Sequence, residues 1–121
     1  MTIQESAEMY LETIHVLSQS NEHVRSIDIC RKMGFSKPSV SRAMKNLSAD
    51  GYISIDANGY ITLNKKGAEI AEKIYERHQI LTSCLVAMGV DEKTAEDDAC
   101  RMEHVISDET FKAIKKHMKS I

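Results

Sequence analysis

Two short helical patterns joined by a glycine turn, with a pair of alternating segments directly after them, occupy residues 26–63 and strongly limit the possible folds. Ser26 is the predicted N-cap of the first helix, because its hydroxyl can accept from free backbone amides, and the helix covers residues 27–33. Gly34 can end that helix in the left-handed conformation. Ser36 then caps a second helix, so the two helices form a helix-turn-helix pattern.

The second helix separates an apolar face from a polar one. Val40, Met44 and Leu47 recur at i, i+4 and i+7 and are predicted to face inward. The opposite face is predicted to be exposed and carries Lys37, Ser39, Ser41, Arg42 and Lys45. The segments YISI and YITL then alternate on either side of an Asn58-Gly59 turn, which predicts a β-hairpin. A helix-turn-helix followed by such a hairpin is typical of a winged helix-turn-helix domain.

The rest of the chain reads as helix, so the predicted class is mainly α with one small β-hairpin. One helix is expected over residues 5–18, and a long helix follows the hairpin until Gly89 interrupts it. Asp91 and Ser107 are the predicted N-caps of two further helices. We expect a DNA-binding domain over residues 1–66 and a helical domain over residues 67–121.

Charge is unevenly distributed along the sequence, although the whole chain carries only −2. Residues 23–66 hold eight Lys and Arg against three Asp, a net charge of +5, while the segments on either side are acidic. A basic middle segment predicts a polyanion as partner. We expect contacts to DNA phosphates or base edges from Ser36, Lys37, Pro38, Ser39, Ser41, Arg42, Lys45, Lys65 and Lys66. The alternative is a basic helical domain that binds another protein.

The chain has no apolar run near the ~20 residues that span a bilayer, and its N-terminus does not resemble a signal peptide. The three cysteines Cys30, Cys84 and Cys100 are widely spaced and odd in number, which argues against a disulfide framework. We therefore expect a cytoplasmic protein without a membrane partner. Cys30 and Cys84 fall among apolar positions and are interpreted as small core or interface residues.

Cys100, Glu103 and His104 stand at i, i+3 and i+4, so one helix would project a thiol, a carboxylate and an imidazole to the same side. This combination is typical of half a metal site. The alternative, a packed cysteine beside an exposed Glu-His pair, is common and stays open. No oxyanion loop or nucleophile elbow surrounds Cys100, which argues against a Cys-His enzyme.

Three upstream residues offer further donors. Met9 and Glu12 lie at i, i+3 on the first helix, and His78 lies on the long helix. If these segments converge with the Cys100 segment, one ion would connect distant parts of the chain. Each residue also has a simpler interpretation: Met9 as a core residue, Glu12 as a solvated acid, and His78 as a partly exposed histidine.

The chain resembles the diphtheria toxin repressor family of metal-dependent regulators, which includes iron-dependent repressors and manganese transport regulators. The segments that carry the resemblance are EMYLETI, SKPSVSRAMKNLSADGYI, LNKKG, YERHQIL and ACRMEHVISDE. It implies a winged helix-turn-helix domain, a helical domain that dimerises, and an ion that acts as corepressor. Longer members append a small SH3-like β-barrel, which we do not expect here.

Carried over residue by residue, the resemblance implies a primary site formed by Met9, Cys100, Glu103 and His104. Sulfur donors at the first two positions match iron-type members, whereas manganese regulators have carboxylates there. A possible second site combines Glu12, His78 and Glu96. Thr82 departs from the iron-type pattern at this second site, because it replaces an acid.

The expected function is therefore repression of metal-uptake genes by a homodimer that binds a palindromic operator when metal is present. Fe(II) is the expected ion and Mn(II) the alternative, while Co(II), Ni(II) or Zn(II) can substitute in vitro, since carboxylate and imidazole ligands accept all of them. The ion would favour one conformer of the dimer and so set two DNA-binding domains in register. The rival hypotheses are a redox sensor that uses Cys100 and, more remotely, a Cys-His enzyme.

Overall fold

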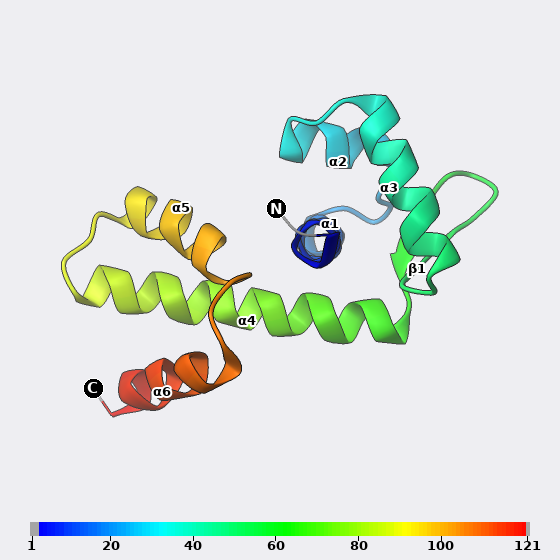
Figure 1. Ribbon diagram of the computed structural model, residues 1–121. Helices are drawn as coiled ribbons and strands as arrows, with labels where there is room; N and C mark the ends of the chain where they lie inside the picture. The colour runs from blue at the N-terminus through cyan, green and yellow to red at the C-terminus, as the bar shows by residue number, and fades with distance from the viewer. Residues whose placement is uncertain (1–2, 121) are drawn as a thin grey trace. The chain divides into compact units, whose positions relative to one another are not determined.

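The computed structural model describes residues 3–120, which form six helices and a two-stranded hairpin (Figure 1). The predicted fold class, mainly α with one small hairpin, is confirmed. The chain divides into two compact units between Glu72 and Lys73. The elements in chain order are α1 (Ile3–Ser20), α2 (Ser26–Met33), α3 (Lys37–Ala49), β1 (Ile53–Ile55), β2 (Ile61–Leu63), α4 (Lys65–Ala87), α5 (Glu92–Met102) and α6 (Asp108–Lys119).

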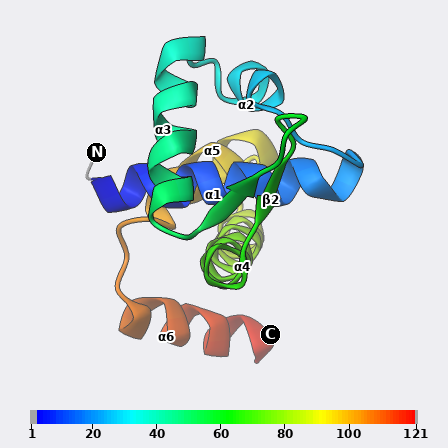
Figure 2. The same ribbon diagram turned by 90° about the vertical axis from the view of Figure 1, so that its right-hand side faces the viewer.

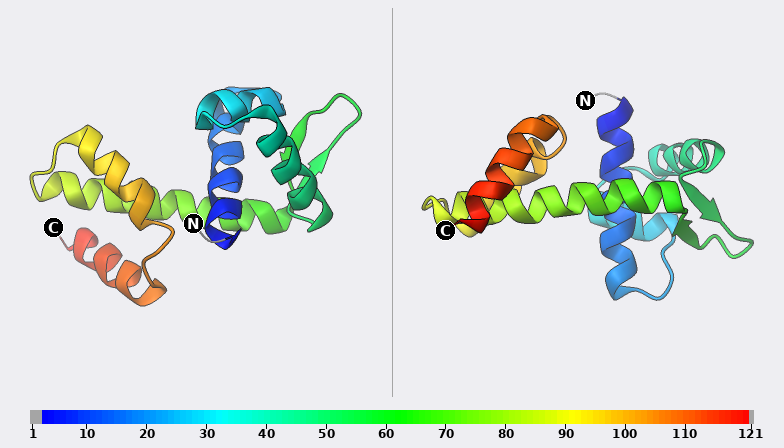
Figure 3. Two further views of the ribbon diagram at one scale, coloured as in Figure 1. Left: turned by 45° about the horizontal axis from the view of Figure 1, so that its top comes forward. Right: turned by 90° about the horizontal axis from the view of Figure 1, so that it is seen from below.

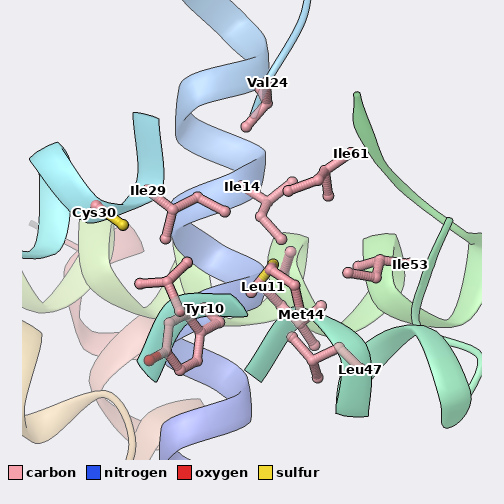
Figure 4. Close-up of a cluster of buried hydrophobic side chains, with 12 residues drawn as sticks. Tyr10, Leu11, Ile14, Val24, Ile29, Cys30, Met44, Leu47, Ile53 and Ile61 are labelled. Carbon is pink, nitrogen blue, oxygen red and sulfur yellow. The ribbon is translucent and has the colours of Figure 1, made fainter. Parts of the chain in front are cut away.

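The N-terminal unit is built around an apolar core to which α1, α2, α3 and the hairpin all contribute. Figure 2 shows α1 crossing beside α3 and β2, and Figure 4 shows its side chains Leu11 and Ile14 among those of the other elements. Ile14, Ile29 and Val40 are fully buried, and Met44 is 1% exposed. Burying side chains of this size stabilises the fold by roughly 1.5–3 kcal/mol each.

Side-chain caps fix where three helices begin, and two of them match the prediction. The hydroxyls of Ser36 and Ser107 accept from the third residue of α3 and α6, at 3.3 and 3.1 Å. The predicted Ser26 cap is wrong, because the N-cap of α2 is Arg25 and Ser26 is the first helical residue. Asp28 explains the difference, since its carboxylate accepts from the backbone N–H of Arg25 at 2.9 Å.

The hairpin follows α3 and pairs Ile53 with Leu63 in antiparallel register. Its turn is organised by Asp56, whose Oδ1 accepts from the backbone N–H of Asn58 at 2.8 Å and of Tyr60 at 2.9 Å. Gly59 has φ of 79°, as the predicted Asn-Gly turn requires. The chain before α2 also joins the hairpin, because the N–H of Ile61 donates to the carbonyl of Val24 at 2.7 Å.

Gly67 marks the place where α4 leaves the hairpin. A Cβ atom at this position would lie 2.2 Å from the backbone carbonyl oxygen of Tyr52 and 3.4 Å from Cδ2 of Leu11. Because a carbonyl in the backbone cannot move aside as a flexible side chain can, the position admits only hydrogen. The glycine thus permits close contact between the first turn of α4 and the segment that enters β1.

The C-terminal unit consists of the later part of α4 with α5 and α6 beside it (Figure 3). Its buried apolar side chains are few: Ile74 and Leu81 on α4, Ala95 and Ala99 on α5, and Phe111 on α6. Asp91 is the N-cap residue of α5 as predicted, but its side chain makes no capping hydrogen bond. None of the helices in the described part of the chain has the length and apolarity needed to cross a bilayer.

Candidate metal centre and DNA-binding surface

The predicted ligand segment lies where α5 ends rather than within it. Cys100 belongs to the last turn of α5, which stops at Met102, so the expected helix continues only as far as the C-cap residue Glu103. Glu103 keeps helical torsion angles and donates its N–H to Ala99 at 2.9 Å, whereas His104 lies in the turn beyond. The next two amides both donate to the carbonyl of Met102 at 3.1 Å, which tightens the chain and ends the helix.

The carboxylate of Glu103 is completely buried and has an imidazole at each of its oxygens. Oε2 lies 2.9 Å from Nδ1 of His78, which α4 supplies, and Oε1 lies 3.2 Å from Nε2 of His104. The side chain of His104 is 5% exposed. The alternative of a solvated Glu-His pair is therefore wrong, and His78 belongs to the same cluster as the predicted primary ligands.

The remaining predicted ligands of the C-terminal unit are exposed. Cys100 is exposed and forms no disulfide, so the alternative of a packed cysteine is also wrong. Glu96 is exposed on α5, about two helical turns before Glu103. The structure therefore brings His78 to Glu103, whereas Glu96 lies apart from this pair along α5.

Met9 and Glu12 belong to the N-terminal unit. Both are partly buried on α1 and stand one helical turn apart, as their spacing predicted. Neither is in the apolar core, which α1 builds from Tyr10, Leu11 and Ile14. The interpretation of Met9 as a core residue is thus wrong.

The donor set around Glu103 suits a divalent cation. Burying an ionised carboxylate is unfavourable unless opposite charge or hydrogen bonds compensate it. Carboxylate and imidazole are ligands that Fe(II), Mn(II), Co(II) and Zn(II) share, and the thiol of Cys100 would add affinity for the softer ions. The residues present therefore fit a transition-metal ion, which would supply positive charge at a buried carboxylate.

The predicted DNA-binding residues lie at the surface of the N-terminal unit. All nine predicted residues are exposed: Ser36, Lys37, Pro38, Ser39, Ser41, Arg42, Lys45, Lys65 and Lys66. Ser36 is occupied within the fold, because its hydroxyl caps α3 and donates to Oγ of Ser39 at 2.9 Å. The ammonium of Lys66 lies 4.3 Å from the ring centre of Tyr52, an arrangement that steadies its long side chain.

One buried charged residue was not among the predicted site residues. Arg77 is 7% exposed and contacts the turn that carries Glu103 and His104. The sequence held a signal for it, since Ile70, Ile74, Arg77 and Leu81 share the spacing of one helical face. A cation in the middle of an apolar stripe indicates a buried residue with partners of its own.

Two family models together cover nearly the whole chain. Residues 2–68 match the N-terminal DNA-binding domain of the iron-dependent repressors, and residues 64–121 match their metal-binding and dimerisation domain. The chain belongs to the iron-dependent repressor family. The resemblance inferred from the sequence is thereby confirmed, and members of this family are metal-dependent transcriptional regulators rather than enzymes.

Curated relatives agree with this assignment. An uncharacterised HTH-type transcriptional regulator of Methanocaldococcus jannaschii is 34% identical over 92% of this chain and 90% of its own length. The transcriptional regulator MntR of Escherichia coli is 33% identical over 88% of this chain and 68% of its own. The diphtheria toxin repressor of Corynebacterium diphtheriae is 27% identical over 97% of this chain and 52% of its own.

Solved structures of other regulators share the fold. The manganese regulator SloR superposes with a TM-score of 0.83 at 28% identity, over 98% of this chain and 55% of that one. A manganese-dependent transcriptional repressor in complex with manganese gives 0.86 at 25% identity, over 93% of this chain and 52% of that one. The chain thus spans about half the length of these two regulators.

Proposed function

We propose that this chain is a metal-activated transcriptional repressor in which Fe(II) is the corepressor and Mn(II) the alternative. The observation that carries the proposal is the buried carboxylate of Glu103, with His78 and His104 at its two oxygens, in a chain that also has a DNA-binding domain. A bound cation would supply the positive charge that stabilises a buried carboxylate.

We assign the primary ligands to Glu103 and His104 together with Cys100 and Met9. The two sulfur donors support Fe(II), because soft ligands are absent from the carboxylate-rich sites expected of manganese regulators. Two structural relatives are described as manganese regulators, which supports Mn(II) as the runner-up. The second proposed site is less well defined. Its candidate ligand His78 contacts Glu103, a ligand of the primary site, and its other candidates are Glu12 and Glu96.

The proposed mechanism is a shift between conformers. An ion held by Met9 on α1 and by the ligands at the end of α5 would bind one conformer better than the others, and metal would therefore enrich that conformer. Moving a population from 1:99 to 99:1 takes about 5.5 kcal/mol of differential affinity. Structural metal sites supply about 10 kcal/mol or more, so the shift is energetically permitted.

The proposed partners are operator DNA and a second copy of the chain. The exposed basic residues of α3 support contact with DNA, and binding should weaken steeply with salt. Val86 and Met88, at the end of α4 and just beyond it, are large exposed apolar side chains that support dimerisation through the C-terminal unit. A symmetric dimer requires a palindromic operator, and metal-uptake genes are the proposed targets.

The decisive experiment selects operators from a random DNA duplex library with Mn(II) present, then titrates Fe(II), Mn(II), Co(II) and Zn(II) anaerobically while DNA binding is followed. We expect metal to raise DNA affinity in the wild type and to do so far less in Glu103→Ala and Cys100→Ala. Glu92→Ala is the matched control, because this exposed residue starts α5 and lies far along the helix from the ligands. DNA binding that ignores metal in all four proteins would refute the corepressor mechanism.

A second candidate function is redox sensing, which the exposure of Cys100 favours. Its thiolate would be oxidised by peroxide, and the DNA would then be released. Peroxide should lower DNA affinity at saturating Mn(II) in the wild type but not in Cys100→Ser. Equal behaviour of the two proteins would exclude this function.

A further inference from the structure

Arg77 is a buried cation in a unit with few buried apolar side chains. It lies on α4 next to His78, and 7% of its surface is exposed. A guanidinium cannot lose its charge at ordinary pH, so burial requires partners that compensate it. What those partners are decides what the residue does.

The partners of Arg77 belong to the turn after α5 and to the start of α6. Nη1 donates to the backbone carbonyls of Glu103 and Ile106, at 3.1 Å each, and Nη2 pairs with the carboxylate of Asp108. The guanidinium carbon lies 5.3 Å from the ring centre of Phe111. One planar group thus holds both ends of the segment that contains His104.

The carbonyl of Glu103, the C-cap of α5, is one that a helix end leaves without an intrahelical partner, and a cationic side chain commonly satisfies such a group. The carbonyl of Ile106 lies in the turn just before Ser107, the N-cap of α6. One of the carbonyls that Arg77 contacts belongs to Glu103, whose side-chain carboxylate contacts His78 and His104. Fixing the carbonyls at 103 and 106 therefore fixes the backbone from which both side chains extend. The rigid fork of arginine can contact several acceptors at once, whereas the ammonium of lysine is a single point.

We infer that Arg77 is a positioning residue for the metal centre, which holds the 103–106 turn so that Glu103 and His104 meet the ion in a set geometry. The inference rests on the proposed function, since it assumes that these side chains bind metal. Groups that orient metal ligands typically change metal affinity 10- to 100-fold when they are removed. Arg77 would act through the backbone, without touching the ion.

The test measures binding of Co(II) and Mn(II) alone, without DNA, to the full chain and its variants. We expect Arg77→Gln to weaken both affinities about 10- to 100-fold and to alter the visible absorption spectrum of bound Co(II), because the ligand geometry changes. Arg77→Lys should restore part of the affinity, since its ammonium can reach one carbonyl but cannot reproduce the fork.

Lys115→Gln is the matched control. Lys115 on α6 pairs with Glu76 on α4 at 2.6 Å, so the change breaks a link between the same two helices without reaching the 103–106 turn. Its Co(II) spectrum and affinities should equal those of the wild type. Asp108→Asn, which removes only the side-chain partner of Arg77, should have a smaller effect than Arg77→Gln and serves if that variant fails to fold.

The outcomes separate this inference from the proposed function. Wild-type affinity and an unchanged Co(II) spectrum in Arg77→Gln would overturn the positioning role while leaving the metal site intact. Equal losses in Arg77→Gln and Lys115→Gln would also overturn it, because they would show a general effect of α4–α6 packing. A wild type that binds neither ion would instead refute the proposed function.

Discussion

The two units of this chain differ in the side chains that they bury. The core of the N-terminal unit is apolar throughout and draws residues from α1, α2, α3 and both strands. In the C-terminal unit the buried apolar side chains are joined by a charged carboxylate, Glu103, and a charged guanidinium, Arg77. Apolar burial is favourable without any partner, whereas buried charge is favourable only when it is compensated.

The N-terminal unit should therefore be stable without a ligand, whereas the stability of the C-terminal unit should depend on metal and on pH. The N-terminal unit should respond mainly to core substitutions, because it supplies only Met9 to the proposed primary site. The C-terminal unit should respond to metal, because it holds most of the candidate ligands, and to pH, because its ion pairs include that of Asp108 with Lys73 and Arg77. A repressor that senses metal needs this division, since its DNA-binding surface must stay folded when the ion leaves.

The largest expected effect comes from Met44→Ala in the apolar core. Removing a fully buried Met typically costs about 2–5 kcal/mol of unfolding free energy, and Met44 is 1% exposed. Hydrogen exchange of the α1 and α3 amides measures it, with and without Mn(II). Met88→Ala is the control, because Met88 is 74% exposed in the C-terminal unit. Similar effects of the two changes on these amides would break the comparison.

Metal should stabilise the C-terminal unit, which supplies three of the four proposed primary ligands, more than the N-terminal core, to which only Met9 connects it. When the free Mn(II) concentration is a hundred times the dissociation constant, binding stabilises the folded state by about 2.7 kcal/mol, provided that the unfolded state does not bind the ion. Amides from Arg101 to Ile106 should gain protection from exchange, and a chelator should remove it. Equal gains in the α3 amides would show that the two units respond together rather than separately.

Gly67→Ala should destabilise the N-terminal unit by about 1–3 kcal/mol, as is usual when a packed region must accept an extra methyl group. The carbonyl of Tyr52 would have to move away from the new Cβ. Denaturant unfolding measures the loss. Ala68→Gly, the reverse substitution at the next position, is the control. It should lower the free energy of unfolding by only about 1 kcal/mol, the difference in helix propensity between alanine and glycine. A harmless Gly67→Ala would contradict the close approach.

The smallest effect concerns the pH dependence of the C-terminal unit. Lys73 and, secondarily, Arg77 lower the pKa of Asp108 below its ordinary value of 3.8. A lowered pKa means that the contribution to stability is present above the ordinary value and is lost as pH falls through the folded-state pKa. Wild type and Asp108→Asn should therefore differ at neutral pH and converge as the pH falls through the lowered folded-state pKa of Asp108.

Glu109→Gln is the control for this prediction, because Glu109 shares the first turn of α6 and its proximity to the helix N-terminus. Acid unfolding followed by circular dichroism compares the three proteins. If Glu109→Gln matched Asp108→Asn across the pH range, the helix dipole rather than the ion pairs would explain the effect.

The N-terminal unit was largely predictable from sequence, because its signals are local. Ser36 caps α3 at the predicted residue, Gly59 turns the hairpin, and Val40, Met44 and Leu47 are buried as their spacing required. The Ser26 cap was wrong for a reason that is also local. Both Ser26 and Asp28 can cap a helix, and only the folded chain shows which of them does.

Of the residues predicted to bind metal, the structure brings His78, Glu103 and His104 together, and their geometry was not predicted. Helical spacing placed Cys100, Glu103 and His104 on one face, yet α5 ends at Met102. The pairing of Glu103 with His78 joins residues 25 positions apart, which no local pattern encodes. Arg77 was not among the predicted site residues, because its partners lie 26 to 31 positions away along the chain and no local pattern encodes them.

The three cysteines give the chain a set of internal kinetic reporters. Cys30 is buried in the N-terminal core, so a thiol reagent reaches it only when that unit opens, and its labelling rate follows the opening free energy. Cys100 is exposed and should react at once, unless an ion holds its sulfur. With Cys84 replaced by serine, one labelling time course would report unfolding of one unit and metal occupancy of the other, in the same sample and without added probes.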